Sequence, residues 1–279
     1  MMVRAEQMVT EEPCQSLLER EGCRLCFWLS GPERGPRVVL THGAGVDHHE
    51  FDGQSAALSE RYRVLCWDVR GHGDSRPASA PFTIARALDD LVAILDHLGW
   101  ARAVFAGHSM GGNLVQELVF NHSERVTAMV ALDCTCNTLP LSALQNLLLA
   151  ISPAMLSLFP YQSLKRLSAN ASSSVPAVRE YLYAAFNQMP RTEFVSILNE
   201  TTKCLHFEPG YRIEQPLLLM VGEFDKTGNI RKIAPRWAMR EPHCRFEIIL
   251  KAGHAANLDN PETVNKLMLE FLAAHAEAV

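Results

Sequence analysis

The stretch of sequence that decides the fold is a short apolar run that leads through a glycine-rich turn into a helix. It reads Ala103-Val104-Phe105-Ala106-Gly107-His108-Ser109-Met110-Gly111-Gly112. Residues 103–106 have the apolar character of a buried strand, and residues 113–120 continue as a helix. Between them stands the pattern G-x-S-x-G, which places a serine on a sharp strand-to-helix turn with its hydroxyl exposed. The pattern and its context predict that Ser109 is a nucleophile.

Further strands and helices alternate on both sides of this turn. Short apolar runs predict strands at Arg37–Thr41, Tyr62–Trp67, Val126–Leu132, Leu217–Val221 and Arg245–Leu250. Helical spacing of apolar residues predicts helices near 51–60, 83–98, 230–239 and 261–276. A turn at Glu21-Gly22 predicts an opening hairpin. Continuous apolar strands that alternate with helices indicate an α/β fold with a mostly parallel central sheet and helices on both faces.

The alternation stops after the strand that ends at Leu132. Residues 137–211 show helical segments only, separated by prolines, before strand signals resume at Leu217. We therefore predict a core made of residues 1–136 and 212–279 and a helical insert of residues 137–211. A single large domain with an insert agrees with the length of 279 residues.

Several motifs in one order give the chain a family resemblance. His42-Gly43 follows the strand at 37–41, and Asp68-x-Arg70-Gly71-His72-Gly73-x-Ser75 follows the strand at 62–67. The G-x-S-x-G turn comes next, and an acid and a histidine follow it. In this order the sequence resembles the α/β-hydrolase superfamily, and within it the capped serine hydrolases of the esterase and lactonase type. It is also similar to cofactor-free haloperoxidases and C–C hydrolases. The resemblance implies an α/β-hydrolase fold whose insert, after the sixth strand, is a helical cap.

The resemblance also implies the catalytic residues. Ser109 matches the nucleophile, His254 the general base and acid, and Asp225 the acid that orients the histidine. Asp133, directly after the sixth strand, is the alternative acid, because some members of the superfamily take it from there. The oxyanion hole is expected from the backbone N–H groups of Met110 and Ala44, with Gly45 as an alternate to Ala44.

The expected activity is hydrolysis of a carboxylic ester or lactone through an acyl-serine intermediate. A serine nucleophile argues against epoxide opening and dehalogenation, which in related enzymes use an aspartate. The alternatives are C–C hydrolysis of β-diketone-type substrates, cofactor-free perhydrolysis of the haloperoxidase kind, or a ligand receptor on the same fold with weak residual hydrolysis. No cofactor and no metal is expected, and the substrate is a small, mostly apolar molecule.

Composition and charge exclude other classes of protein. The chain has 26 Lys and Arg against 31 Asp and Glu, a formal net charge of −5, and no basic cluster larger than a pair. Nucleic acid is therefore not expected as a partner. No apolar run approaches the ~20 residues of a membrane span, and residues 1–13 lack the apolar segment of a signal peptide. We predict a cytoplasmic protein with no membrane partner and with its eight cysteines reduced, and we leave open a homo-oligomer.

Other polar motifs favour structural interpretations. The pair Cys23 and Cys26 is expected in an early strand rather than in a metal site, and His48-His49 in a polar loop. The charged turn at 68–75 is expected to brace its loop by hydrogen bonds. Four cationic residues of the insert are expected to lie on solvated helix faces: Lys165, Arg166, Arg179 and Arg191.

Overall fold

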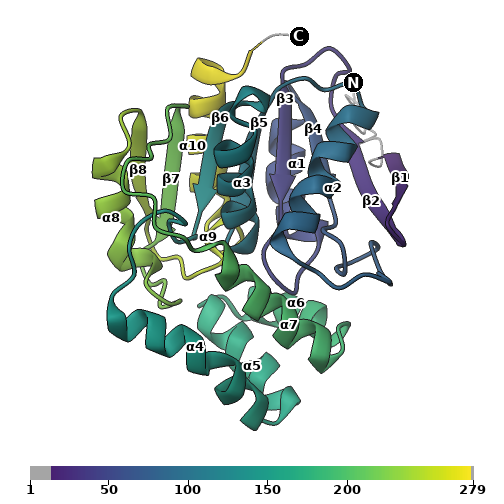
Figure 1. The fold of residues 1–279 in the computed structure, drawn as a ribbon. Helices are drawn as coiled ribbons and strands as arrows, with labels where there is room; N and C mark the ends of the chain where they lie inside the picture. Colours follow the sequence, from purple (N-terminus) through teal and green to yellow (C-terminus); the bar gives the residue numbers. More distant parts are fainter. Residues whose placement is uncertain (1–13, 278–279) are drawn as a thin grey trace, which may run out of the picture.

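The computed structural model describes residues 14–277, without the side chains of residues 14, 15, 153, 154, 156 and 157. Eight strands form one sheet in the order β1-β2-β4-β3-β5-β6-β7-β8 (Figure 1). The strands are β1 (Cys14–Arg20), β2 (Cys23–Ser30), β3 (Arg37–Thr41), β4 (Arg63–Trp67), β5 (Ala103–His108), β6 (Val126–Leu132), β7 (Leu217–Gly222) and β8 (Cys244–Ile249). β1 and β2 form the predicted hairpin, β2 also runs antiparallel to β4, and all other neighbours are parallel. The predicted mostly parallel sheet is confirmed.

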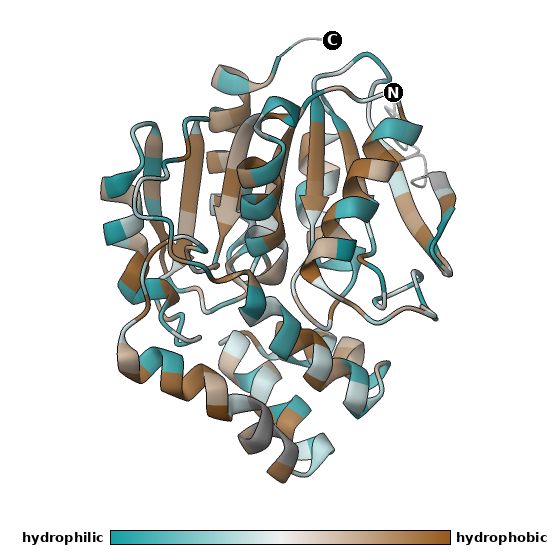
Figure 2. Cartoon of the chain, viewed as in Figure 1, coloured by the Kyte–Doolittle hydropathy of each residue, from teal (hydrophilic) through white to brown (hydrophobic). Residues whose placement is uncertain are grey.

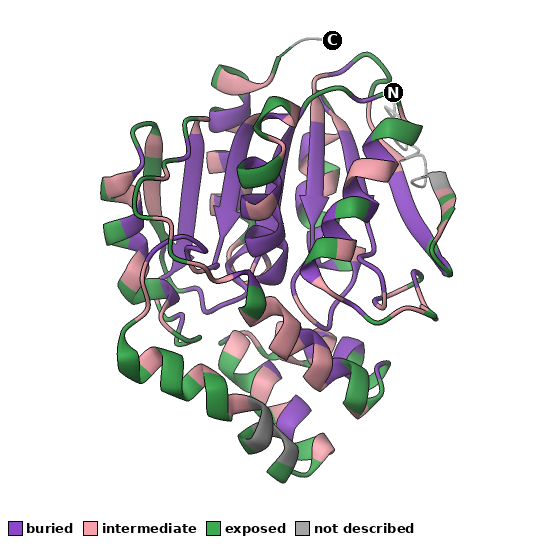
Figure 3. Cartoon of the chain, viewed as in Figure 1, coloured by how far each residue is buried: buried purple, intermediate pink, exposed green. Residues whose placement is uncertain are grey.

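Helices cover both faces of this sheet, as its buried strands require (Figures 1 and 3). The helices of the core are α1 (Asp52–Leu58), α2 (Ile84–His97), α3 (Met110–Asn121), α8 (Ile230–Arg240), α9 (Ala256–Asp259) and α10 (Pro261–His275). One apolar cluster joins one face of the sheet to α2, α3 and α8, and a second joins the other face to α1 and α10. The central strand β5 is buried along its whole length, so its end is a rigid place for a reactive residue.

The helix predicted at 51–60 is present as one short helix, and a further element precedes it. The short 3-10 helix η1 (His48–Phe51) precedes α1 (Asp52–Leu58). The Asp47 side chain accepts a hydrogen bond from the backbone N–H of His49 and so begins η1 upstream of the apolar run. Two further 3-10 turns are η2 (Ser123–Arg125) and η3 (Thr202–Cys204).

Four helices lie between β6 and β7 and cover the lower edge of the sheet in Figure 1. They are α4 (Ala143–Leu158), α5 (Tyr161–Ser172), α6 (Pro176–Asn187) and α7 (Arg191–Thr201). Prolines stand at the start of three of them, where the missing N–H costs no helical hydrogen bond. None of the helices within residues 14–277 is long and apolar enough to cross a membrane. Residues 1–13, on which the signal-peptide prediction rests, lie outside the described residues.

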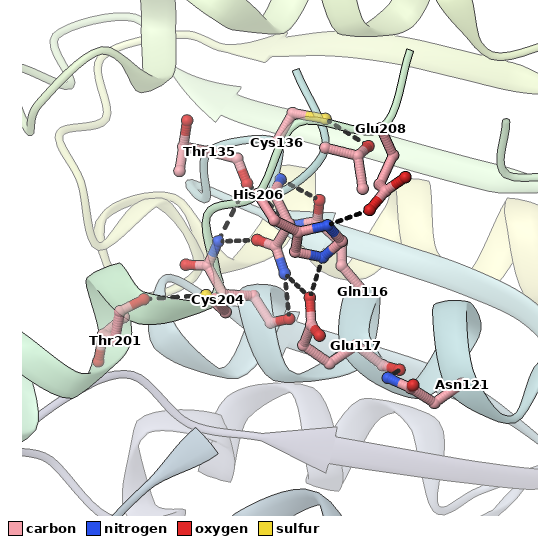
Figure 4. Close-up of polar contacts among 12 residues, drawn as sticks. Gln116, Glu117, Asn121, Thr135, Cys136, Thr201, Cys204, His206 and Glu208 are labelled. Atoms are coloured by element: carbon pink, nitrogen blue, oxygen red, sulfur yellow. Dashed lines mark hydrogen bonds and ion pairs between the residues drawn. The ribbon is translucent and has the colours of Figure 1, made fainter. Parts of the chain in front are cut away.

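The two chain segments that connect these helices to the core are held together and to α3 (Figure 4). The backbone N–H of His206 donates to the carbonyl of Asn137 at 2.8 Å. Glu117 of α3 accepts a hydrogen bond from Asn137 Nδ2 at 2.7 Å and lies 3.2 Å from His206 Nε2. The entry and exit of the insert are therefore fastened to the helix that follows Ser109.

The prediction that Lys165 lies on a solvated face is wrong. Its side chain is buried inside the insert, where Nζ donates to Asn187 Oδ1 and lies 4.4 Å from the ring centre of Tyr161. The ring of Tyr183 lies on the same cation, at 5.8 Å. Two aromatic faces and an amide oxygen thus take the place of water around the ammonium group. Arg166, in contrast, is partly exposed, pairs with Glu180 at 2.7 Å and lies over the outer Tyr183 ring.

Candidate active site

Ser109 stands between β5 and α3 in a backbone conformation that serine rarely adopts, with φ 50° and ψ −116°. The chain turns so sharply that neighbouring backbones nearly touch. A Cβ on Gly111 would lie 2.1 Å from the carbonyl oxygen of Thr41, and one on Gly107 would lie 2.3 Å from the carbonyl carbon of Gly111. The glycines of the G-x-S-x-G pattern are therefore a steric requirement of the turn, as the sequence predicts.

His254 and Asp225 extend from Ser109 in a chain of polar contacts. His254, in the loop after β8, places Nε2 3.0 Å from Ser109 Oγ and Nδ1 3.1 Å from Asp225 Oδ2. The other oxygen of Asp225 accepts the backbone N–H of Thr227 at 2.7 Å. Burial alone would raise the pKa of Asp225, but the neighbouring His254 and the N–H of Thr227 lower it below its ordinary value. Asp225 is thus suited to be the ionised member of the chain.

Asp133, the alternative acid, lies beside Asp225 but faces other partners. Its carboxylate oxygens accept the backbone N–H groups of Gly222 at 2.7 Å and Ala256 at 3.2 Å. Complete burial, and then the negative charge of Asp225, raise the pKa of Asp133 well above its ordinary value. Of the two acids, Asp225 supplies the oxygen at 3.1 Å from His254, and Asp133 ties together the loops that carry Asp225 and His254.

Asp133, Asp225 and His254 could in principle hold a metal ion, because their ligand atoms lie close together. No other such group occurs among the residues that the structure describes. One ligand atom each from Asp133, Asp225 and His254 lies within 4.8 Å of the others. Both oxygens of Asp133 and both ring nitrogens of His254 already have protein partners. We therefore interpret the group as a hydrogen-bonded network that positions the histidine.

The residues predicted for the oxyanion hole flank Ser109. Met110 is the first residue of α3, so its N–H precedes the helical hydrogen-bond pattern. Ala44 lines the same cavity as Ser109 and His254. Gly45 next to it has φ 79°, and a Cβ there would lie 2.8 Å from the Phe194 ring. The loop after β3 can adopt this course only with glycine at position 45.

A buried ion pair behind Ser109 is a feature that sequence reasoning missed. Glu50 of η1 places Oε1 2.9 Å from Nδ1 of His108, and its Oε2 accepts the N–H of Gly43 at 2.8 Å. The other ring nitrogen of His108 donates to the carbonyl of His254 at 2.7 Å. Burial would lower the pKa of His108, but the charge and hydrogen bonding of Glu50 raise it to about 9. An imidazolium that pairs with the Glu50 carboxylate and donates to the carbonyl of His254 therefore connects the loop of Ala44, the turn of Ser109 and the loop of His254.

A cavity of about 290 Å³ opens in front of Ser109. Its apolar wall comes from the core and from α6 and α7, through Val46, Leu182, Phe186, Phe194 and Leu198. The rings of Phe186 and Phe194 meet edge to face at 5.2 Å. A larger hollow of about 520 Å³, between α2, α3 and η3, contains none of the three predicted catalytic residues.

The charged turn after β4 has the bracing role that its sequence predicts. Asp68 accepts the backbone N–H groups of His48 and Asp74, each at 2.7 Å. Arg70 is buried and binds Asp90 of α2 through two nitrogens, at 2.5 and 2.6 Å. The predicted strand position of Cys23 and Cys26 is also confirmed, in β2.

Comparison with known proteins identifies the family. The model of the alpha/beta hydrolase family matches residues 38–267, which is most of the chain. This protein therefore belongs to the alpha/beta hydrolase family, and it is a hydrolase of that family.

The names of its relatives indicate different small-molecule substrates. RutD of Caulobacter sp. (strain K31), which carries the name of a carbamate hydrolase, is 27% identical over 256 residues, 86% of this chain and 91% of its own. The 3-oxoadipate enol-lactonase 1 of Acinetobacter baylyi is 38% identical over 96 residues, 34% of this chain and 36% of its own. The structure of the enol-lactonase from Burkholderia xenovorans LB400 shares the fold with a TM-score of 0.80 at 23% identity, over 92% of this chain and 100% of that one.

Proposed function

We propose that this protein hydrolyses a carboxylic ester or a lactone through an acyl-serine intermediate. The observation that carries the proposal is the chain of contacts from Ser109 Oγ through His254 to Asp225, at 3.0 and 3.1 Å, beside an open cavity. A serine hydroxyl attacks a carbonyl only when a base removes its proton and a further group holds that base in the correct orientation.

In the proposed mechanism Ser109 Oγ attacks the carbonyl carbon while its proton passes to Nε2 of His254. The negative charge moves to the carbonyl oxygen, where the N–H groups of Met110 and Ala44 stabilise it; each such donor contributes roughly 3–4 kcal/mol. Asp225 keeps the proton of Nδ1 on the side away from Ser109 and stabilises the imidazolium. His254 then protonates the leaving alkoxide. A water molecule, deprotonated by His254, releases the acid and restores Ser109.

The cavity limits the substrate to a small or medium acyl group. Its volume of about 290 Å³ and its wall of leucine, valine and phenylalanine side chains favour an apolar chain over a polar one. We propose that residues 137–211 act as the cap that sets this preference, because α5, α6 and α7 each contribute residues to the wall.

A panel of p-nitrophenyl esters with acyl chains of increasing length, together with simple lactones, tests the proposal. We expect turnover by the wild type and a loss of at least 1,000-fold in Ser109→Ala. Ser168→Ala, which changes another serine of the cavity wall, is the matched control and keeps most of the activity. An ester-mimicking phosphonate should add its mass to Ser109 and to no other serine.

Two results would contradict the proposal. Equal rates for the wild type and Ser109→Ala would show that hydrolysis does not use this serine. Tight binding of an ester without turnover by the wild type would instead favour a ligand receptor on the same fold.

A further inference from the structure

Helix α4 exposes an unusual row of apolar side chains. Figure 2 shows brown segments along this helix, and Figure 3 shows that most of it is exposed. The side chains, which we call the α4 stripe, are between 42% and 77% exposed: Leu144, Leu147, Leu148, Ile151, Met155 and Leu158. Contiguous apolar surface of this kind on a water-exposed helix indicates a contact surface. The helix packs on its own chain mainly against α7, which leaves the stripe uncovered.

The spacing of the stripe is that of a helix that pairs with another helix. Leu144, Leu148, Ile151, Met155 and Leu158 follow one another at intervals of four, three, four and three residues. This mean period of 3.5 residues is the one that two packed helices use along their common seam. The stripe is also nearly symmetric about Ile151, with apolar residues four and seven positions away on each side.

The charge pattern selects the kind of occupant. No Asp, Glu, Lys or Arg occurs between Asp133 and Lys165, whereas the whole chain has a net charge of −5. Two copies can therefore meet at α4 without repulsion between like charges. A helix that lies in a lipid surface carries Lys or Arg on its polar face, and α4 has neither within its bounds.

We propose that the α4 stripe is the surface through which two copies of this chain associate. A two-fold axis through Ile151 runs the two helices antiparallel, so that Leu144 of one copy meets Leu158 of the other. This arrangement also opposes the two helix dipoles. A helix of 16 residues is about 24 Å long, so the buried area lies at the low end for protein interfaces. The dimer is therefore weak and dissociates on dilution.

Sedimentation velocity between about 1 and 100 µM measures the association. We expect the mass to rise with concentration toward twice the 31.1 kDa of one chain. The double variant Leu148→Glu with Ile151→Glu should remain a monomer throughout, with an unchanged circular dichroism spectrum. Met239→Glu, on an 81% exposed apolar residue of α8, is the matched control and should still dimerise.

Cysteine cross-linking tests the antiparallel arrangement. Under mild oxidation Ile151→Cys should form a covalent dimer with itself, because the two-fold axis places position 151 opposite its own copy. Leu158→Cys should do so only when it is mixed with Leu144→Cys. Six of the seven cysteines whose side chains are described are buried, and the oxidised wild type serves as the background.

Three outcomes would overturn the proposal. A wild type that is monomeric at every concentration has no such surface. A dimer that survives both glutamate substitutions uses another face. A monomer that floats with phosphatidylcholine vesicles, and whose double variant does not, would show that the stripe is a lipid-binding face instead.

Discussion

The buried ion pair between Glu50 and His108 makes a pH-dependent prediction about stability. His108 is 4% exposed and Glu50 1%, so solvent screens the pair little. Replacing Glu50 with Gln keeps the size of the side chain and an acceptor for the N–H of Gly43, but removes the charge that holds a proton on His108. We expect Glu50→Gln to unfold more easily than the wild type, and the difference to depend on pH.

The magnitude follows from the pKa of His108. Burial lowers this pKa, but Glu50, with smaller contributions from Asp133 and the carbonyl of His254, raises it from 6.5 to about 9. Each unit of pKa difference between the folded and unfolded states corresponds to about 1.4 kcal/mol. A raised histidine pKa stabilises the folded state fully below pH 6.5, and this contribution is lost as the pH rises through about 9. The free energy of unfolding of Glu50→Gln should therefore be lower than that of the wild type by about 3 kcal/mol at pH 6, and by less than about 1 kcal/mol at pH 9.

Urea denaturation at pH 6, 7, 8 and 9 measures the difference between the two proteins. The difference is the useful quantity, because buried cysteines also titrate on unfolding near pH 8.5 and do so equally in both. The matched control is Glu241→Gln. Glu241 is also buried and accepts a backbone N–H, from Ile213 at 2.7 Å, but its charged partner is Arg240. Arginine keeps its proton over this range, so the effect of Glu241→Gln should not change with pH.

If the loss of unfolding free energy in Glu50→Gln did not change with pH, as expected for Glu241→Gln, the prediction would be refuted. It would mean that His108 is neutral in the wild type and that Glu50 acts only as a hydrogen-bond acceptor for Gly43. A difference below about 0.5 kcal/mol at pH 6 would show that the pair contributes no net stability, as is found for some buried ion pairs.

Four further substitutions test the catalytic site and its surroundings. Asp225→Asn should lower kcat by about 10³–10⁴-fold on any ester that the wild type cleaves, whereas Asp133→Asn should cost less than about tenfold; the reverse order would make Asp133 the orienting acid. Gly45→Ala introduces a Cβ at φ 79° that would lie 2.8 Å from Phe194, so the loop that carries Ala44 must shift and steady-state rates should fall for every ester of the panel. Tyr181→Phe removes the hydrogen bond of 3.1 Å from this α6 side chain to Asp47, and should lower the free energy of urea unfolding by about 1 kcal/mol with kcat nearly unchanged.

The fold and the line of three candidate catalytic residues could be predicted because their signals are local. Five consecutive residues determine the turn around Ser109. Its glycines are required because a Cβ at Gly107 or Gly111 would collide with neighbouring backbone atoms. Asp225 and His254 each follow a recognisable apolar strand, and parallel strands bring their carboxyl ends to one edge of the sheet. Chain order, strand ends and the family resemblance together predicted which residues come together, and they left Asp133 open as the alternative acid.

The charged pairs could not be predicted in the same way, because each joins residues that are far apart in the sequence. Glu50 stands in a stretch of polar residues that is typical of a loop, and only the fold places it against His108, 58 positions later. Lys165 looks like any cation of a surface helix, and its burial depends on the rings of Tyr161 and Tyr183. The residues next to a charged side chain in the sequence do not show whether that side chain is buried with a partner or solvated.

Three buried carboxylates around one serine show how much this distinction matters. Asp225 and Glu50 each face a histidine, and their pKa values are lowered although burial opposes it. Asp133 accepts two backbone N–H groups and feels the positive charge of His108, but complete burial and the charge of Asp225 still raise its pKa. Two neighbouring carboxylates that both carried a charge in this buried site would repel each other strongly. The repulsion therefore appears at Asp133, whose pKa is raised, whereas direct contact with His254 keeps the pKa of Asp225 low.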